Sequence, residues 1–102
     1  MKEIDASSCL VHVLVCTNER PPEKSCCKRV GGQEFYDKLK NKLKETGYRS
    51  SIWATRTGCL GHCNDVGATV TIHVKGRPPE WFSEVTDKDF ETVWAKLVSY
   101  SR

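Results

Sequence analysis

Two pairs of cysteines, far apart in the sequence, constrain this chain more than any other feature. Nine residues separate Cys16 from Cys26, and Cys27 follows directly. Three residues separate Cys59 from Cys63, and 32 residues lie between the two pairs. Each pair falls in its own loop, so folding must bring the loops together. Iron–sulfur clusters are held by thiolates arranged in this way, and the spacing therefore predicts a thiolate metal site.

The length of the chain bounds how much core it can form. At 102 residues it has room for one domain, in which folding buries about two thirds of the surface of the unfolded chain. Its content of 38% hydrophobic and 28% charged residues is ordinary for a globular protein. We expect a single domain over residues 9–102, with residues 1–8 as a disordered N-terminal end.

The six cysteines also allow a framework of disulfides, as in many small secreted proteins. No apolar stretch approaches the roughly 20 residues needed to cross a bilayer. The start of the chain, Met1-Lys2-Glu3-Ile4-Asp5, lacks the apolar segment of a secretory signal. Both observations favour the cytoplasm, where clustered thiols are more often metal ligands or redox groups than disulfides.

The first half of the chain reads as strand, helix, strand. Residues 10–15 form an apolar run typical of a buried strand, and the polar residues 17–32 follow it as a loop. Phe35, Leu39 and Leu43 recur every four residues and predict a helix that ends at Gly47. Residues 48–55 then predict a second strand, which runs into the loop that carries the second cysteine pair.

The second half reads as strand, strand, helix. Val70, Ile72 and Val74 alternate along residues 69–74, residues 75–79 turn the chain, and residues 81–85 can return as an antiparallel strand. Thr86 and Asp89 have the spacing of a capping box variant at the start of a last helix. The expected buried stripe of this helix is Phe90, Val93, Trp94 and Leu97. The three tryptophans, Trp53, Trp81 and Trp94, are expected in the core. The order predicts an α/β thioredoxin-like fold: βαβ then ββα, with a central mixed four-stranded sheet and flanking helices.

Several motifs in this order resemble the thioredoxin-like [2Fe-2S] ferredoxins over residues 10–98. They are His12-Val-Leu-Val-Cys16-Thr-Asn-Glu-Arg-Pro-Pro, Lys24-Ser-Cys26, Gly58-Cys59-Leu-Gly-His-Cys63, Trp81-Phe82 and Val85-Thr86-Asp87-Lys88-Asp89-Phe90. The resemblance implies a thioredoxin-like fold, electron transfer, one [2Fe-2S] cluster and often a homodimer. Carried over position by position, it implies that the cluster ligands are Cys16, Cys26, Cys59 and Cys63.

The sequence departs from that family near two of these ligands. The loop between the first two is shorter than usual, and Cys26 and Cys27 are both candidates for the second position. Ser25 favours Cys26, because serine directly precedes this ligand in the family. Members of the family also tend to have Gly-Pro soon after the last ligand, where this chain has Asn64-Asp65-Val66-Gly67-Ala68.

Two other classes of protein remain as alternatives to the electron carrier. Zinc also takes four thiolates, which would make this a zinc-stabilised structural or interaction domain, but zinc loops usually have two to four residues between paired cysteines. A thiol–disulfide redox protein on the same fold would use Cys-x-x-Cys, which this chain lacks. No arrangement of residues indicates hydrolytic chemistry, so we expect no enzyme activity.

The remaining chemistry-bearing residues are expected to be a free thiol, Cys9, and two structural histidines, His12 and His73.

The charge of the chain bears on its partners. A formal net charge of +3, without any recognised nucleic-acid-binding motif, gives no indication of nucleic-acid binding. Cations in the cysteine loops would stabilise an added electron, and they either steer an acidic redox partner protein or are only part of the solvated surface. They are Arg20, Lys24, Lys28, Arg29 and Arg56.

Overall fold

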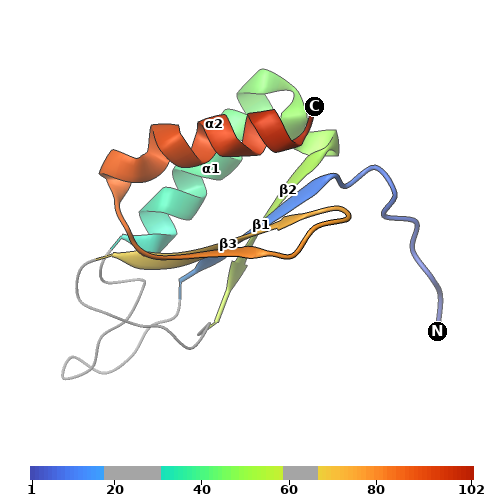
Figure 1. Ribbon diagram of the computed structural model, residues 1–102, viewed down its shortest axis with the longest axis horizontal. Helices are drawn as coiled ribbons and strands as arrows, with labels where there is room; N and C mark the ends of the chain where they lie inside the picture. Colours follow the sequence, from blue (N-terminus) through green and yellow to red (C-terminus); the bar gives the residue numbers. More distant parts are fainter. Residues whose placement is uncertain (18–30, 59–66) are drawn as a thin grey trace.

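The computed structural model describes residues 1–17, 31–58 and 67–102. Its helices and strands follow the order β1, α1, β2, β3, β4, α2. The βαβ half and the ββα half predicted from the sequence are both present, and the whole is an α/β fold with helices packed on a mixed sheet (Figure 1).

The sheet has four strands in the spatial order β2-β1-β3-β4. The two central strands are β1, Val11–Cys16, and β3, Ala68–Val74. The edge strands are β2, Ile52–Thr57, and β4, Glu80–Val85. Strand β1 pairs parallel with β2 and antiparallel with β3, and β3 pairs antiparallel with β4. The predicted mixed four-stranded sheet is therefore confirmed.

Helix α1, Gly32–Thr46, connects the parallel strands β1 and β2. Phe35, Leu39 and Leu43 are buried, as the four-residue spacing predicts. The helix ends at Gly47, whose φ of 79° lies in the left-handed region that glycine adopts at helix ends because it has no Cβ. Tyr36 also packs against the core, and the exposed side of the helix is polar.

The C-terminal helix starts with the predicted capping box. The backbone N–H of Thr86 donates to Asp89 Oδ2 at 3.0 Å, and the Thr86 hydroxyl lies 3.4 Å from the same oxygen. A 3₁₀ turn, Asp87–Asp89, leads into helix α2, Phe90–Tyr100. The capping box satisfies free donors at the start of this helical segment, which fixes where the chain leaves β4.

Both helices lie on the same face of the sheet (Figure 1), and the core fills the space between. Phe35 of α1 and Phe90 of α2 meet edge to face, with ring centroids 5.4 Å apart. Aliphatic side chains of the sheet complete this layer, among them Val11, Val13, Val15, Val70 and Ile72, all without exposed surface. Burial of such side chains is the main favourable term in folding.

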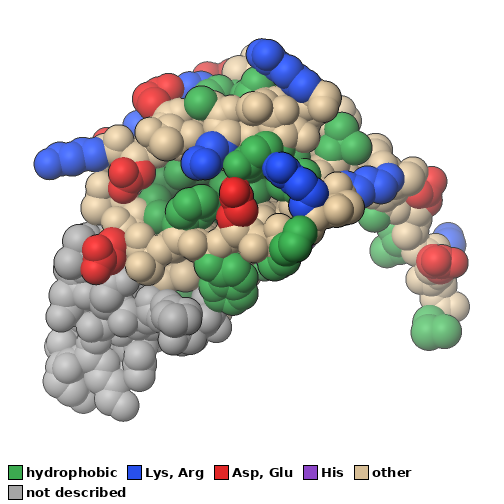
Figure 2. All heavy atoms as spheres, in the orientation of Figure 1, with side chains coloured by type: hydrophobic (Ala, Val, Ile, Leu, Met, Phe, Trp, Pro, Cys, Tyr) green, Lys and Arg blue, Asp and Glu red, His purple; other side chains and the backbone are tan. Residues whose placement is uncertain are grey.

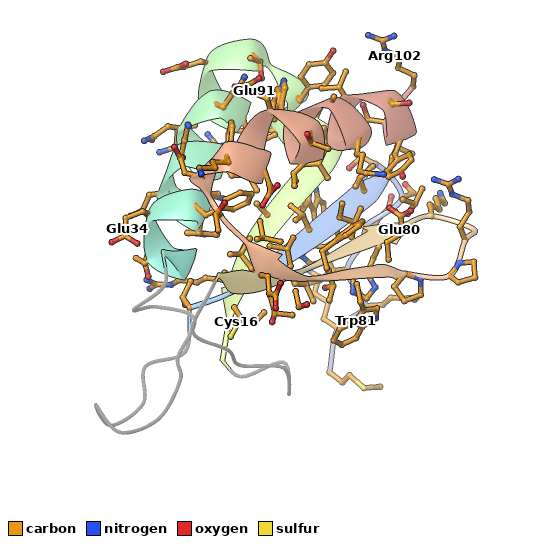
Figure 3. All side chains as sticks on the ribbon, turned by 60° about the vertical axis from the view of Figure 1, so that its left-hand side comes forward. Cys16, Glu34, Glu80, Trp81, Glu91 and Arg102 are labelled. Atoms are coloured by element: carbon orange, nitrogen blue, oxygen red, sulfur yellow. The ribbon has the colours of Figure 1, made fainter. Side chains whose placement is uncertain are left out.

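Two expectations about the strands and tryptophans were wrong. Tyr48–Ser50 forms a 3₁₀ turn, so the second strand begins only at Ile52. Trp53 is only partly buried and lies outside the hydrophobic core, and Trp81 is 53% exposed. Trp81 lies opposite Thr71, on the face of the sheet that the helices leave uncovered, because strand residues alternate between faces (Figure 3).

Residues 1–8 contain no helix or strand, every one of them is exposed, and the N-terminus lies away from the sheet (Figure 1). Their disorder, and the single domain over residues 9–102, stay predictions. Within the described ranges, no helix is long and apolar enough to span a membrane.

Candidate metal centre

Cys16 is the predicted ligand that the structure describes. It is the last residue of β1, has no exposed surface and is not in a disulfide. It pairs with Thr57, the last residue of β2. Figure 3 shows it at the end of the sheet. A thiol held at the end of a central strand has a fixed direction, which is what a ligand requires.

The ends of the neighbouring strands are tied together next to Cys16. The backbone N–H of Thr17 donates to the carbonyl oxygen of Thr57 at 3.0 Å, and its hydroxyl donates to the same oxygen at 3.4 Å. Residues 18–30 follow Thr17, and residues 59–66 follow Gly58, one residue after Thr57. Both cysteine-bearing stretches therefore leave the described part of the chain from adjacent positions.

Both stretches also rejoin the described part of the chain at this edge of the sheet, which here means the side where β1 and β2 end. Val15 near the end of β1 opposes Val70 near the start of β3, so β3 begins beside the end of β1. Helix α1 returns from the end of β1 to the start of β2, so its first residue, Gly32, lies toward this edge as well (Figure 1). The scaffold thus brings both ends of both stretches to one edge of the sheet.

The other candidate ligands, Cys26, Cys27, Cys59 and Cys63, lie outside the described residues. The four-ligand set stays a prediction for this reason. Within residues 1–17, 31–58 and 67–102, no group of three or more His, Cys, Asp or Glu side chains is placed to hold a metal ion. What the described residues offer is one buried thiol of the predicted four, and its chemistry fits a thiolate-bound group.

Cys9 lies at the other end of β1 from Cys16. The strand itself spans about 17 Å between these ends at 3.3 Å per residue. The thiol of Cys9 lies 3.5 Å from the carbonyl oxygen of Val11, and burial raises its pKa above the ordinary value. Cys9 is a free thiol, as expected, and its position is too remote for a ligand role beside Cys16.

Charged side chains near this edge are of both signs. Of the predicted loop cations, Arg56 is described and exposed, one residue before Thr57, and the other four lie outside the described residues. Figure 2 shows Lys and Arg side chains interspersed with Asp and Glu over the visible face of the molecule. That face carries no extended patch of one sign.

Two residues close to this edge were not singled out from the sequence. Gly67 precedes β3, and a Cβ at this position would lie 2.5 Å from the carbonyl oxygen of Val85. Glu84, next to Val85, has a φ of 58°. The glycine before an alternating strand was the available signal for the first. Nothing in the sequence marks the second, because glutamate rarely adopts this conformation.

The architecture and the buried thiol together define a thioredoxin-like fold with one positioned cysteine. No family model matches the chain. A protein from Priestia megaterium named "Putative 2Fe-2S ferredoxin" is 32% identical over 77 residues, which cover 76% of this chain and 52% of that relative. This chain therefore spans about half the length of the relative.

Solved structures are similar over nearly the whole chain. The wild-type thioredoxin-like [2Fe-2S] ferredoxin from Aquifex aeolicus superposes with a TM-score of 0.76 at 24% identity, covering 92% of this chain and 90% of the other. Another structure of a thioredoxin-like [2Fe-2S] ferredoxin from the same organism gives 0.73 at 26% identity, covering 88% and 81%. The chain has the fold of the thioredoxin-like [2Fe-2S] ferredoxins, and the resemblance inferred from its motifs is confirmed.

Proposed function

We propose that this chain is a small electron carrier that holds one [2Fe-2S] cluster on Cys16, Cys26, Cys59 and Cys63. The cluster supplies one-electron redox chemistry, and each of its irons takes two terminal thiolates. The protein's part is to fix the thiolates, exclude water from the buried side and present the other side to a partner.

The observation that carries this proposal is that the described residues from which both cysteine-bearing stretches start lie side by side, next to the buried thiol of Cys16. The hydrogen bond from Thr17 to Thr57 joins the points where the two stretches begin. A [2Fe-2S] cluster needs ligands from both stretches at once, so this arrangement lowers the cost of closing the site. A scaffold with the stretches at opposite ends of the sheet would not support it.

The comparisons support the same function. The relative from Priestia megaterium is named as a 2Fe-2S ferredoxin, and the similar structures are of [2Fe-2S] ferredoxins. The relative is about twice as long as the part that this chain covers. The structural likeness, at 24% identity, shows a shared fold and not a shared activity. Electron transfer by this chain is accordingly a proposal that needs its own test.

We also propose the finer properties that the ferredoxin reading carries. The chain would exchange electrons with redox partner proteins that present an acidic surface to Arg56 and the loop cations, have no catalytic activity of its own, act in the cytoplasm and form a homodimer. Salt would slow electron exchange if charge steers the encounter, because ions screen attraction between exposed groups. Sedimentation of the purified protein measures its oligomeric state.

The function is tested on protein purified without oxygen. We expect red-brown colour that bleaches with dithionite, together with two irons and two acid-labile sulfides per chain. A colourless protein with stoichiometric zinc would establish the structural-domain alternative instead. A protein with neither iron nor zinc would support the other alternative, a thiol–disulfide redox protein that uses the same cysteines.

Cys16→Ser, with Cys9→Ser as its matched control, tests the ligand role of the described thiol. Serine has nearly the same volume as cysteine but is a poor ligand for iron, so Cys16→Ser should lose or alter the visible chromophore. Cys9→Ser should leave it unchanged because Cys9 lies at the other end of β1. A colourless Cys9→Ser protein would overturn the ligand assignment.

The choice between Cys26 and Cys27 as second ligand needs a separate pair of variants. We propose Cys26, because Ser25 precedes it. The chromophore should then survive Cys27→Ser unchanged and be lost or altered in Cys26→Ser. EPR of the reduced proteins separates true loss from rescue by the neighbouring thiol, since a changed ligand geometry shifts the signal. An altered signal only in Cys27→Ser would assign Cys27 instead.

A further inference from the structure

The face of the sheet opposite the helices carries two histidines side by side. His12 of β1 and His73 of β3 are directly opposed in the antiparallel register. Directly opposed residues on one face have Cβ atoms about 4.5–5.5 Å apart, which brings the imidazoles within reach of one ion. Both histidines are partly exposed, and the helices lie on the other side of the sheet (Figure 1).

An open cavity of about 350 Å³ lies over this pair. Its lining includes both histidines and Trp53 of β2, whose ring meets that of His12 edge to face at 6.3 Å. The end of the segment that precedes β1 and the end of β3 close its other sides, through Ala6, Ser7, Cys9, Leu10, Val74 and Lys75. The cavity gives a small ion and its water molecules access to both imidazoles.

A threonine hydroxyl holds one nitrogen of each imidazole. His12 Nε2 lies 2.7 Å from Thr55 Oγ1, and His73 Nε2 lies 3.2 Å from Thr71 Oγ1. A hydroxyl can accept from Nε2–H, which holds the ring in the tautomer that leaves a lone pair on Nδ1. Metal-binding histidines in proteins are oriented by such a contact on their second nitrogen. Within residues 1–17, 31–58 and 67–102, no hydrogen bond reaches either Nδ1.

We propose that His12 and His73 form an open two-imidazole site for a divalent transition-metal ion, with the threonines Thr55 and Thr71 as positioning residues. Cys9 also lines the cavity, but among the described residues no third His, Cys, Asp or Glu side chain is placed to bind the same ion, so water completes the coordination. Imidazole suits Zn²⁺, Cu²⁺ and Ni²⁺, whereas Mg²⁺ and Ca²⁺ prefer oxygen ligands.

This site is separate from the proposed cluster. His12 and Cys16 lie on β1 four residues apart, which corresponds to about 13 Å along the strand. The two sites share no described ligand. The histidine site does not depend on the electron-carrier proposal, and each is tested on its own.

Nickel titration of the anaerobically purified holoprotein tests the site, because Ni²⁺ does not oxidise thiols. Calorimetry at fixed neutral pH should report one Ni²⁺ per chain. His12→Gln and His73→Gln should each reduce binding to that of a single surface imidazole. Thr55→Val keeps both imidazoles and should weaken binding by about 10–100-fold, the usual effect of losing such an orienting contact.

Two further readouts keep the thiols and the third histidine apart from this site. Cys9→Ser should bind Ni²⁺ like the wild type. In proton NMR the ring signals of His12 and His73 should broaden together at the first equivalent, ahead of that of His62. Binding that survives in the His12→Gln/His73→Gln double variant, or disappears in Cys9→Ser, would overturn the proposal. Circular dichroism confirms that each variant is folded.

Discussion

The backbone of Val85 lies directly against Gly67. A Cβ built on Gly67 would lie 2.5 Å from the carbonyl oxygen of Val85 and 2.6 Å from the carbonyl carbon of Glu84. These are backbone atoms of β4, which cannot move aside as the end of a flexible side chain can. The close approach fixes where the chain passes from the second cysteine-bearing stretch into β3.

Gly67→Ala should therefore destabilise the fold and loosen the proposed cluster site. We expect a loss of about 1–3 kcal/mol in the free energy of unfolding, the usual effect of adding a methyl group where no space exists. Urea unfolding, followed by circular dichroism, measures the change. The chromophore should also bleach faster in air, because the start of β3 must shift.

Gly58→Ala is the matched control for this substitution. Gly58 borders the same stretch at its other end, but a Cβ there would meet nothing within 4 Å. Its free energy of unfolding should change by no more than about 0.5 kcal/mol. Equal losses in the two variants would mean that the contact with Val85 does not set the stability of this edge.

Thr17→Pro should separate the stability of the fold from that of the cluster site. Proline removes the N–H that donates to Thr57 at 3.0 Å, while the extended conformation of Cys16 tolerates a following proline. We expect a loss of about 1 kcal/mol in unfolding free energy and a larger loss of bound iron per chain. Thr17→Ala keeps the N–H and should retain its iron. Full iron content in Thr17→Pro would argue against a role for this tie.

Local signals in the sequence were enough to predict most elements. The four-residue spacing of Phe35, Leu39 and Leu43 fixes the buried side of α1, and Gly47 fixes its end. The capping box of Thr86 and Asp89 is likewise a short-range pattern. Each depends on residues within one or two turns, so no knowledge of the tertiary fold was needed.

Which individual residues of distant segments come into contact could not be predicted. The opposition of His12 and His73 follows from the register of β1 with β3, which alternation alone does not give. The contact of Gly67 with Val85 depends in the same way on the path of β4. The ligand set was predicted from cysteine spacing and resemblance, and beyond Cys16 it lies outside the described residues.

Replacing Glu84 with glycine should cost less stability than replacing its neighbour Ser83 with glycine. Between the pairs Ala68–Val85 and Val70–Phe82, β4 contains one more residue than β3, which makes a bulge, and Glu84 there has a φ of 58°. The left-handed conformation costs a residue with a Cβ about 1–2 kcal/mol. Glycine at this position relieves that cost, which offsets the entropic cost of glycine in the unfolded chain. Glu84→Gly should match or exceed wild-type stability, whereas Ser83→Gly should lose about 0.5–1 kcal/mol. Urea midpoints compare the two, and a larger loss in Glu84→Gly would contradict the bulge geometry.

His12 should make the stability of the metal-free protein depend on pH. Burial lowers the pKa of its imidazole below the ordinary value of 6.5, and the nearby His73 lowers it further. The unfolded chain therefore binds a proton at a higher pH than the folded chain does, so stability rises with pH across this interval. The contribution is complete above pH 6.5 and is lost as the pH falls through the folded pKa. Chelator-treated wild type should lose stability from pH 7 to pH 5, and His12→Gln should lose less. If the free energy of unfolding in urea changes with pH equally in the two proteins, His12 has the same pKa in the folded and unfolded chains.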